Sequence, residues 1–300
     1  MSYVLTAVAS DKNRPLTEKH IKEIGNIAGH YNVRLTGKMV WLDKGKAADV
    51  PVSDEFQFAL VSHIREFLAG DKIDFFITPE KNRQKKLLLA DMDSTIVTSE
   101  TLDELAEYAG VKEHVAEITR RAMNGELDFH AAIKERVGLL EGLAVTALEA
   151  TLEETKLSKG AEIFVGTMRA HGATCVLVSG GFTFFTQDIA DRCGFQFNHG
   201  NTLEIQGEKL TGNVVLPILD KHSKVGFLKD YMLDLNLNPE ECITIGDGAN
   251  DLPMLKLAGL GIGYHPRPAV AAEVSNAIIY GDLTAALYAQ GYSSKHFKRL

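Results

Sequence analysis

The sequence predicts an α/β protein in which a small α+β unit precedes a Rossmann-like parallel sheet with a helical cap insertion. From residue 87 onward, short apolar runs alternate with helix-like segments, as is typical of parallel strands that are buried on both faces. Strand-like runs are missing between about residues 98 and 159, which predicts an all-helical insertion after the first strand. We therefore expect two domains, at residues 1–80 and 81–300, with the cap at about 98–159.

The overall composition restricts the class of protein. A chain of 300 residues, of which 45% are hydrophobic, can form about two packed domains. Its net charge of −8 argues against general nucleic-acid binding, which favours basic surfaces. Three cysteines without CxxC spacing argue against a disulfide framework or a zinc site. The N-terminus does not resemble a signal peptide and no apolar run approaches the roughly 20 residues that span a bilayer, so we expect a cytoplasmic protein without a membrane partner.

Residues 1–80 have the β-α-β-β-α-β pattern of a ferredoxin-like unit. Two amphipathic helices are expected at residues 17–29 and 54–68, the first with Thr17 as its N-cap. The expected strands are residues 3–9, 33–42 and 73–78, with a weaker one at 46–53. The polar and basic segment 79–86 is interpreted as a solvated linker rather than a nucleic-acid patch.

The second domain is predicted from five buried-looking runs and three cap helices. The runs are residues 87–90, 174–178, 242–245, 260–262 and 277–280. The cap helices are residues 102–110, 115–125 and 128–140. Asp128 is a plausible N-cap for the third of these helices. Residues 201–215, with Gly207 at the turn, predict a β-hairpin.

Small and acidic residues follow three of the apolar runs, where sheets of this kind bind ligands. DMDST at 91–95 follows the first run, SGG at 179–181 the second, and GDGAND at 246–251 the third. Each motif alone is commonly a turn or a capping loop, and Lys224 alone would be a solvated helix residue. Because the carboxyl ends of parallel strands share one edge of the sheet, the motifs together predict a functional site.

Phosphoryl transfer through an aspartyl intermediate is the chemistry that these groups suit. Asp91 would be the nucleophile, and Asp93 would protonate the leaving alkoxide and then deprotonate the attacking water. Because a carboxylate repels a phosphate, cations are required. Asp91 and Asp247, with the main-chain carbonyl of Asp93, would hold Mg²⁺, a hard ion that prefers oxygen ligands.

Three further groups would stabilise the phosphoryl oxygens. Lys224 would place a positive charge beside them. Ser179 and the backbone N–H at Gly180 would donate hydrogen bonds, because glycine has no side chain to block a close approach.

These motifs resemble the four motifs of the haloacid dehalogenase-like phosphohydrolases, and the likeness covers about residues 87–290. The resemblance implies the roles given above for the strand-end aspartates. It also implies that Asn250 and Asp251 support the phosphate and metal sites. The N-terminal unit resembles an ACT-like regulatory domain, in its pattern of elements rather than in a motif.

The resemblance also implies a substrate that is a phosphorylated amino acid, with O-phospho-L-serine the expected one and L-serine the product of a biosynthetic last step. Glu100 would meet the ammonium group and Arg136 the carboxylate. A zwitterion needs one charge of each sign, and arginine binds a planar carboxylate with two hydrogen bonds. Met123 and Phe129 match apolar cap residues that exclude water on closure, although periodicity alone would place both in the cap core.

Several alternatives stay open at this point. A related phosphatase could act on phosphothreonine, phosphohomoserine or a sugar phosphate, although a sugar phosphate offers no partner for Glu100 and Arg136. An amino-acid-sensing regulator with an inert phosphatase domain is a second alternative, and transfer to an alcohol instead of water is a third. Residues 1–80 could sense serine, pack, or form a homodimer.

Overall fold

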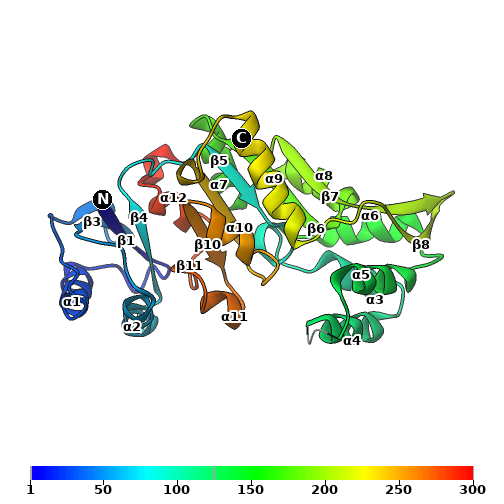
Figure 1. Cartoon of the computed structure of the whole chain (residues 1–300), viewed down its shortest axis with the longest axis horizontal. Coiled ribbons are helices and arrows are strands. Elements are labelled where there is room, and N and C mark those ends of the chain that lie inside the picture. Colours follow the sequence, from blue (N-terminus) through cyan, green and yellow to red (C-terminus); the bar gives the residue numbers. More distant parts are fainter. Residues whose placement is uncertain (1, 124–125, 300) are drawn as a thin grey trace.

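The computed structural model describes residues 2–123 and 126–299 and contains two sheets that lie side by side (Figure 1). The first sheet is antiparallel, has the strand order β2-β3-β1-β4 and carries both of its helices on one side. Its elements are β1 (Tyr3–Ala9), α1 (Glu18–Gly29), β2 (Val40–Asp43), β3 (Ala47–Val52), α2 (Phe58–Ala69) and β4 (Ile73–Pro79). This order of elements is the one predicted for a ferredoxin-like unit.

One strand of this unit was predicted wrongly. Of the expected strand 33–42 only the last three residues lie in a strand, β2 (Val40–Asp43), and Leu35 makes an isolated bridge to Val52. The segment that looked weak in the sequence forms β3, which pairs with β1 along six residues and is almost entirely buried. Burial between neighbouring strands decides this case, because β-propensity reflects packing more than an intrinsic backbone preference.

The second sheet has the order β11-β10-β9-β5-β6-β7-β8 and is parallel except for the β7–β8 hairpin, as the sequence predicts. Its strands are β5 (Leu87–Ala90), β6 (Thr174–Phe182), β7 (Phe197–Gln206), β8 (Lys209–Val215), β9 (Cys242–Gly246), β10 (Leu260–Tyr264) and β11 (Asn276–Ile278). Gly207 lies at the hairpin turn with a φ of 63°, a conformation that glycine adopts without strain.

Helices cover both faces of this sheet because successive side chains of a strand point to opposite faces. Leu88 and Ala90 belong to the core on one face, together with residues of α7, α8 and α12, whereas Leu87 and Leu89 pack with α9 and α10 on the other. The helices are α7 (Ala161–Ala170), α8 (Thr183–Cys193), α9 (Lys221–Asp234), α10 (Leu252–Leu257), α11 (Pro268–Ala271) and α12 (Ala285–Ala289). This part of the chain also contains two short 3-10 helices, η2 (Pro239–Glu241) and η3 (Ser294–His296).

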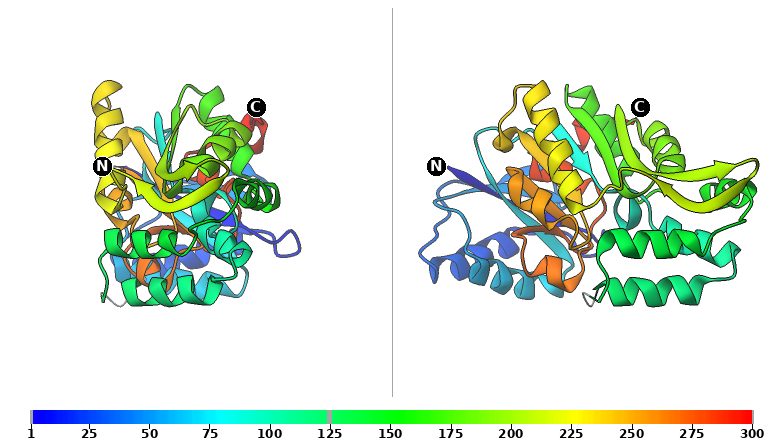
Figure 2. Two further views of the ribbon diagram at one scale, coloured as in Figure 1. Left: turned by 90° about the vertical axis from the view of Figure 1, so that its right-hand side faces the viewer. Right: turned by 45° about the vertical axis from the view of Figure 1, so that its right-hand side comes forward.

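The described residues between β5 and β6 form helices and no strand beyond isolated bridges at Val97, Ala144 and Leu157, as the sequence predicts. After the irregular turn η1 (Met92–Ile96), the helices are α3 (Thr101–Tyr108), α4 (Lys112–Met123), α5 (Phe129–Gly138) and α6 (Val145–Glu154). Asp128 caps α5 by accepting hydrogen bonds from the backbone N–H groups of His130 and Ala131 at 2.8 and 3.0 Å. Figure 2 shows the β7–β8 hairpin extending over these helices.

The two sheets are joined through polar contacts between β4 and the segment around β11. Asn276 exchanges side-chain hydrogen bonds with the backbone N–H and C=O of Ile77, at 2.8 and 3.3 Å. Asp74 accepts backbone N–H groups of Ile279 and Gly281, at 2.8 Å each. The N-terminal unit is therefore docked on the parallel sheet by fixed hydrogen bonds. In the part of the chain that the structure describes, no helix is both long and apolar enough to cross a membrane.

Candidate active site

Strand β5 delivers Asp91 to the carboxyl edge of the parallel sheet, between β6 and β9. The backbone N–H of Asp91 still pairs with the carbonyl of Ile245 on β9 at 3.0 Å, and its carboxylate accepts the N–H of Met92 at 2.9 Å. Only 4% of this aspartate is exposed. The sheet therefore holds a buried carboxylate in a fixed position at the end of its central strand.

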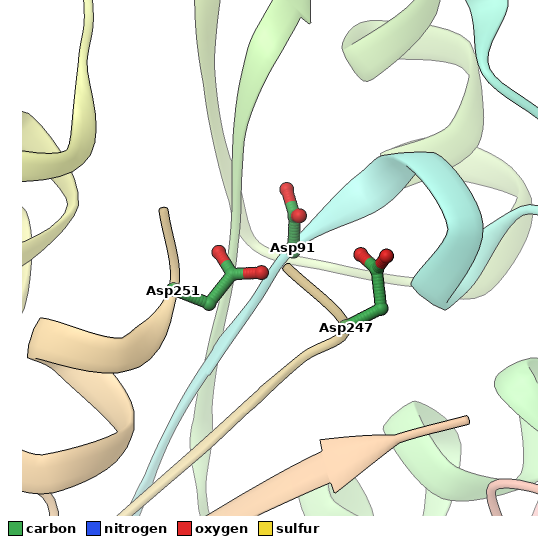
Figure 3. Close-up of side chains that lie close together, drawn as sticks. All are labelled: Asp91, Asp247 and Asp251. Carbon is green, nitrogen blue, oxygen red and sulfur yellow. The ribbon is translucent and has the colours of Figure 1, made fainter. Parts of the chain in front are cut away.

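Two further carboxylates lie beside Asp91 (Figure 3). Asp247 and Asp251 come from the loop between β9 and α10, and carboxylate oxygens of the three residues lie within 4.8 Å of one another. Lys224, on α9, places its Nζ atom 2.6 Å from Asp91 Oδ1 and 2.6 Å from Asp251 Oδ1. The cluster thus holds three buried carboxylates and one buried ammonium group, which leaves it short of positive charge.

The pKa values follow from this imbalance. Burial raises the pKa of Asp91 well above its usual range, Asp251 raises it further, and Lys224 opposes both. Burial, with Asp251 and Glu100, raises the pKa of Asp247 to about 6. Burial alone would lower the pKa of Lys224, but Asp251 and Asp91 outweigh it and raise that pKa. A cluster of oxygen ligands with excess negative charge fits a hard divalent cation, so these residues can hold a metal ion.

Asp93 lies on the turn after β5 and faces the same edge from the cap side. Its carboxylate accepts the backbone N–H of Thr101 at 3.0 Å and the Ser179 hydroxyl at 3.1 Å. Burial, followed by the charge of Glu100, raises the pKa of Asp93 to about 6. A carboxyl group that titrates near neutral pH can exchange a proton with a substrate.

The turn that carries Asp93 is locally strained. Ser94 has a φ of 53°, in the left-handed region that non-glycine residues seldom adopt. Its hydroxyl donates to Glu100 Oε1 at 2.7 Å, which compensates part of that cost. Strain of this kind is tolerated where the surrounding structure fixes it. Here the strained turn carries both Asp93 and the hydroxyl group that holds Glu100.

The glycines of the SGG and GDGAND motifs make room for carboxylates. A Cβ atom on Gly181 would lie 2.8 Å from Asp93 Oδ2, and one on Gly246 would clash with the carboxyl group of Asp251. The carbonyl of Gly180 accepts a hydrogen bond from the Asn201 side chain at 2.8 Å, which fixes the SGG turn. The sequence predicts that the glycine at position 180 allows a ligand to approach closely. In the structure, Gly181 and Gly246 also leave space for carboxyl groups of the protein itself.

Asn250 and Arg136, also predicted as site residues, make contacts of their own. Exposed Asn250 donates to Asp251 Oδ1 at 3.5 Å. Arg136, on α5, donates through Nε to the carbonyl of Ala132 at 3.3 Å. Burial lowers the pKa of Arg136, whereas the charges of Asp103, Glu100 and Asp93 raise it, so its guanidinium lies within electrostatic range of the site. The side chains of Met123 and Phe129 lie outside the described part of the structure.

One residue of the site, Arg267, was not predicted from the sequence, and another has a larger part than predicted. Arg267 places its Nε 3.5 Å from Asp247 Oδ2 and its Nη2 3.4 Å from Glu100 Oε1, so it links the strand-end loop to the cap side. Asp251, expected to play a supporting role, is a full member of the carboxylate cluster. Arg267 could have been found from its position, because it follows the fourth apolar run, 260–262, which ends at the same edge of the sheet.

Comparison with known proteins agrees with this geometry. The model of the haloacid dehalogenase-like hydrolase family matches residues 88–256. A phosphoserine phosphatase from Lactococcus lactis is 42% identical over 191 residues, which cover 64% of this chain and 88% of that protein. A phosphoserine phosphatase from Archaeoglobus fulgidus is 41% identical over 186 residues, 62% of this chain and 54% of that protein. The chain therefore spans about half the length of the second relative and most of the first.

A solved structure resembles the whole chain, including the N-terminal unit. It is a HAD family hydrolase from Salmonella enterica subsp. enterica serovar Typhi, with a TM-score of 0.81 and 29% sequence identity. The superposition covers 96% of this chain and 98% of that one. The α/β fold with its N-terminal addition is thus found in a known hydrolase.

Proposed function

Because the chain belongs to the haloacid dehalogenase-like hydrolase family, we propose that it hydrolyses O-phospho-L-serine to L-serine and phosphate, the last step of L-serine biosynthesis. The observation that carries the proposal is the buried cluster of Asp91, Asp247, Asp251 and Lys224 at the strand ends. The relatives described above carry the name of this activity. The oppositely charged Glu100 and Arg136 near the cluster support an amino-acid substrate.

In this proposal Asp91 attacks the phosphorus atom and forms a phospho-aspartyl intermediate. Asp93 gives a proton to the leaving serine oxygen and later takes one from the attacking water. A pKa of about 6 suits Asp93 to both tasks near neutral pH. The hydrogen bonds from Thr101 and Ser179 hold its carboxyl group in position for the transfer.

Mg²⁺ is the proposed cofactor, held by Asp91, Asp247 and the main-chain carbonyl of Asp93, with Asp251 supporting them. When bound, the ion supplies the positive charge that these carboxylates and a phosphate together require. Lys224 contributes a second positive charge beside Asp91.

Binding of the phosphoryl oxygens is assigned to Ser179, the N–H at Gly180 and Asn250, with Lys224 close by. Glu100 binds the substrate ammonium and Arg136 its carboxylate. Met123 and Phe129 are proposed to exclude water when the cap closes, on the resemblance alone. A sugar phosphate would leave Glu100 and Arg136 unpaired, which disfavours it as a substrate.

Phosphate release tests the proposal directly. The purified protein is assayed with Mg²⁺ on O-phospho-L-serine, its D-isomer, O-phospho-L-threonine, a sugar phosphate and an aryl phosphate. Asp91→Asn is the blank, and Asp234→Asn, at an exposed aspartate on α9, is the matched control. We expect a strong preference for O-phospho-L-serine that EDTA removes. Equal or higher activity on the sugar phosphate would contradict the substrate assignment, and inactivity on all five would favour a regulatory protein.

The N-terminal unit carries separate proposals. We place the domain boundary at residues 80 and 81, with the cap at about 98–159, and interpret the first domain as an ACT-like regulatory unit that forms a homodimer. A monomeric mass in solution would contradict the dimer. A cytoplasmic location is also proposed, supported by three buried and unpaired cysteines (Cys175, Cys193, Cys242).

A further inference from the structure

Arg65 reaches from the N-terminal unit to the second domain. It lies on α2, and its guanidinium donates hydrogen bonds to the carbonyls of Ala271, Val274 and Ser275, at 2.9, 3.0 and 3.1 Å. These carbonyls belong to the C-terminal end of α11 and the turn that follows it, where backbone acceptors have no partner within the helix. One arginine of the first domain therefore fixes the end of a helix in the second.

The opposite end of α11 lies at the candidate active site. Arg267 is the residue immediately before the helix, and its backbone N–H donates to the carbonyl of Asp247 at 3.1 Å. Its guanidinium contacts the carboxylates of Asp247 and Glu100 at 3.5 and 3.4 Å. A proposed metal ligand and a proposed substrate-binding residue thus both depend on where Arg267 is held.

The segment between these two ends is short and firmly packed. Residues 267–274 are joined by backbone hydrogen bonds from Val270 to Arg267 at 2.8 Å and from Val274 to Val270 at 3.2 Å. Val270 is fully buried and packs with Val274 and Ala277. Figure 1 shows α11 between α2 and the cap helices. Because this single helical turn is anchored by the buried Val270, a displacement at one end is passed to the other end.

We propose that Arg65 is a positioning residue for the active site and the route by which the N-terminal unit influences substrate binding. By holding the C-terminal end of α11, Arg65 fixes Arg267, and Arg267 in turn fixes Glu100 and Asp247. The part of this inference that concerns the substrate rests on the proposed function, because only an amino-acid phosphate uses Glu100. Contiguity alone does not establish coupling, so the test measures the coupling itself.

Arg83 provides a matched control within the same chain. It also crosses the junction, donating to the carbonyls of Ala289 and Tyr288 at 3.1 and 3.3 Å and to Asp49 at 2.6 Å. Its partners on the second domain belong to α12, which contributes no residue to the site among those described. Loss of either arginine loosens the docking of the two domains, but only loss of Arg65 affects α11.

The experiment compares Arg65→Met, Arg65→Lys and Arg83→Met after each is shown to be folded at the assay temperature. Hydrogen–deuterium exchange is measured in residues 247–251 and 267–275, together with kcat and KM on O-phospho-L-serine and on an aryl phosphate. For Arg65→Met we expect faster exchange in both segments. We also expect a KM for O-phospho-L-serine that is about threefold to tenfold higher, with the aryl phosphate changed less than about twofold. Arg65→Lys should lie between wild type and Arg65→Met, because lysine cannot reach three carbonyls in a fixed fork.

The outcomes separate the two proposals. Equal changes in Arg65→Met and Arg83→Met, or unchanged exchange in residues 267–275 of Arg65→Met, would overturn the inference. If Arg65 acts through Arg267, then adding Arg65→Met to Arg267→Met changes the KM no further, whereas additive effects contradict that route. If wild type does not hydrolyse O-phospho-L-serine, the proposed function fails while the exchange data still decide whether Arg65 fixes α11.

Discussion

Two buried aspartates of this chain are paired with a cation in opposite ways. Asp49, at the junction of the two sheets, accepts hydrogen bonds from Nη1 and Nη2 of Arg83 at 2.6 and 2.7 Å and from Thr6 Oγ1 at 2.8 Å. Arg83 also donates to carbonyl groups of the second domain. One guanidinium meets one carboxylate, and every oxygen of that carboxylate has a donor.

Asp91, at the edge of the parallel sheet, shares its cation instead. The Lys224 ammonium lies 2.6 Å from both Asp91 and Asp251, and Asp247 lies in the same cluster. Its pKa is raised because burial and Asp251 outweigh the effect of Lys224. The half-exposed Arg267 reaches Asp247 but is 3.5 Å away.

The difference in charge balance between Asp49 and Asp91 indicates a different role for each site. A balanced pair stabilises one geometry, and the Asp49–Arg83 pair fixes how the two sheets dock. An unbalanced cluster lowers stability unless a ligand compensates it, so a chain that keeps one has a functional reason. Four experiments test this difference between the two aspartates.

The largest effect is expected from Asp91→Asn. Removing the proposed nucleophile should lower kcat about 10⁴-fold or more on O-phospho-L-serine, because no other carboxylate occupies its place. The same change should leave the free energy of unfolding unchanged or higher, since Lys224 keeps Asp251 at 2.6 Å. Steady-state phosphate release and urea unfolding measure the two quantities. A strongly destabilised Asp91→Asn protein would contradict the view that the cluster is under-compensated.

Arg83→Met should have the reverse profile. It leaves Asp49 buried without its cation, so we expect a loss of about 3 kcal/mol in the free energy of unfolding, with a KM for the substrate close to that of wild type. Arg120→Met, at an exposed ion pair on α4, is the control and should change the free energy of unfolding little. Thermal and urea unfolding of the three proteins decide the matter, and equal losses for both variants would argue against the balanced-pair interpretation.

Mg²⁺ should supply the charge that the cluster lacks. At about 100 times its dissociation constant, the ion should raise the free energy of unfolding by about 2.7 kcal/mol. Asp247→Asn should lose most of this gain, because it removes one proposed ligand. Melting temperatures are compared with and without Mg²⁺ at constant ionic strength. The same gain in wild type and Asp247→Asn would place the ion elsewhere.

The smallest effect concerns Lys85, a buried cation whose acceptors are neutral. Its Nζ donates to the carbonyls of Asn82 and Glu240 at 2.7 Å each, and burial lowers its pKa to about 8. Because this pKa lies below the unfolded value of 10.5, the unfolded state binds more protons between pH 8 and 10.5, and stability rises with pH there.

Lys85→Met should remove that rise. Between pH 8 and 10, wild type should gain about 1–2 kcal/mol relative to the variant. Lys86→Met is the matched control at the neighbouring lysine, which is exposed and paired with Glu241, and it should show no such pH dependence. Urea unfolding at three pH values provides the measurement. A constant difference between wild type and Lys85→Met would mean that Lys85 stays charged throughout.

Local sequence patterns determined a large part of this protein. Short apolar runs between helix-like segments placed the parallel strands, and the absence of such runs placed the helical insertion after β5. Asp128 was identifiable as an N-cap because the signal is a short polar side chain beside the first turn. The strand-end rule brought Asp91, Ser179 and Asp247 to one edge, since parallel strands end together.

Only the tertiary structure decided the features that depend on distant residues. The weak segment 47–52 became a buried strand because β1, far from it in the sequence, pairs with it on one side while β2 pairs with it on the other. Arg267 meets Glu100, and Arg65 meets the end of α11, across 167 and 206 positions of the sequence. Charge balance at Asp49 and imbalance at Asp91 also depend on which cation the fold brings within hydrogen-bond distance. Periodicity records which face of an element is buried, but it does not record what that face or its ends will meet.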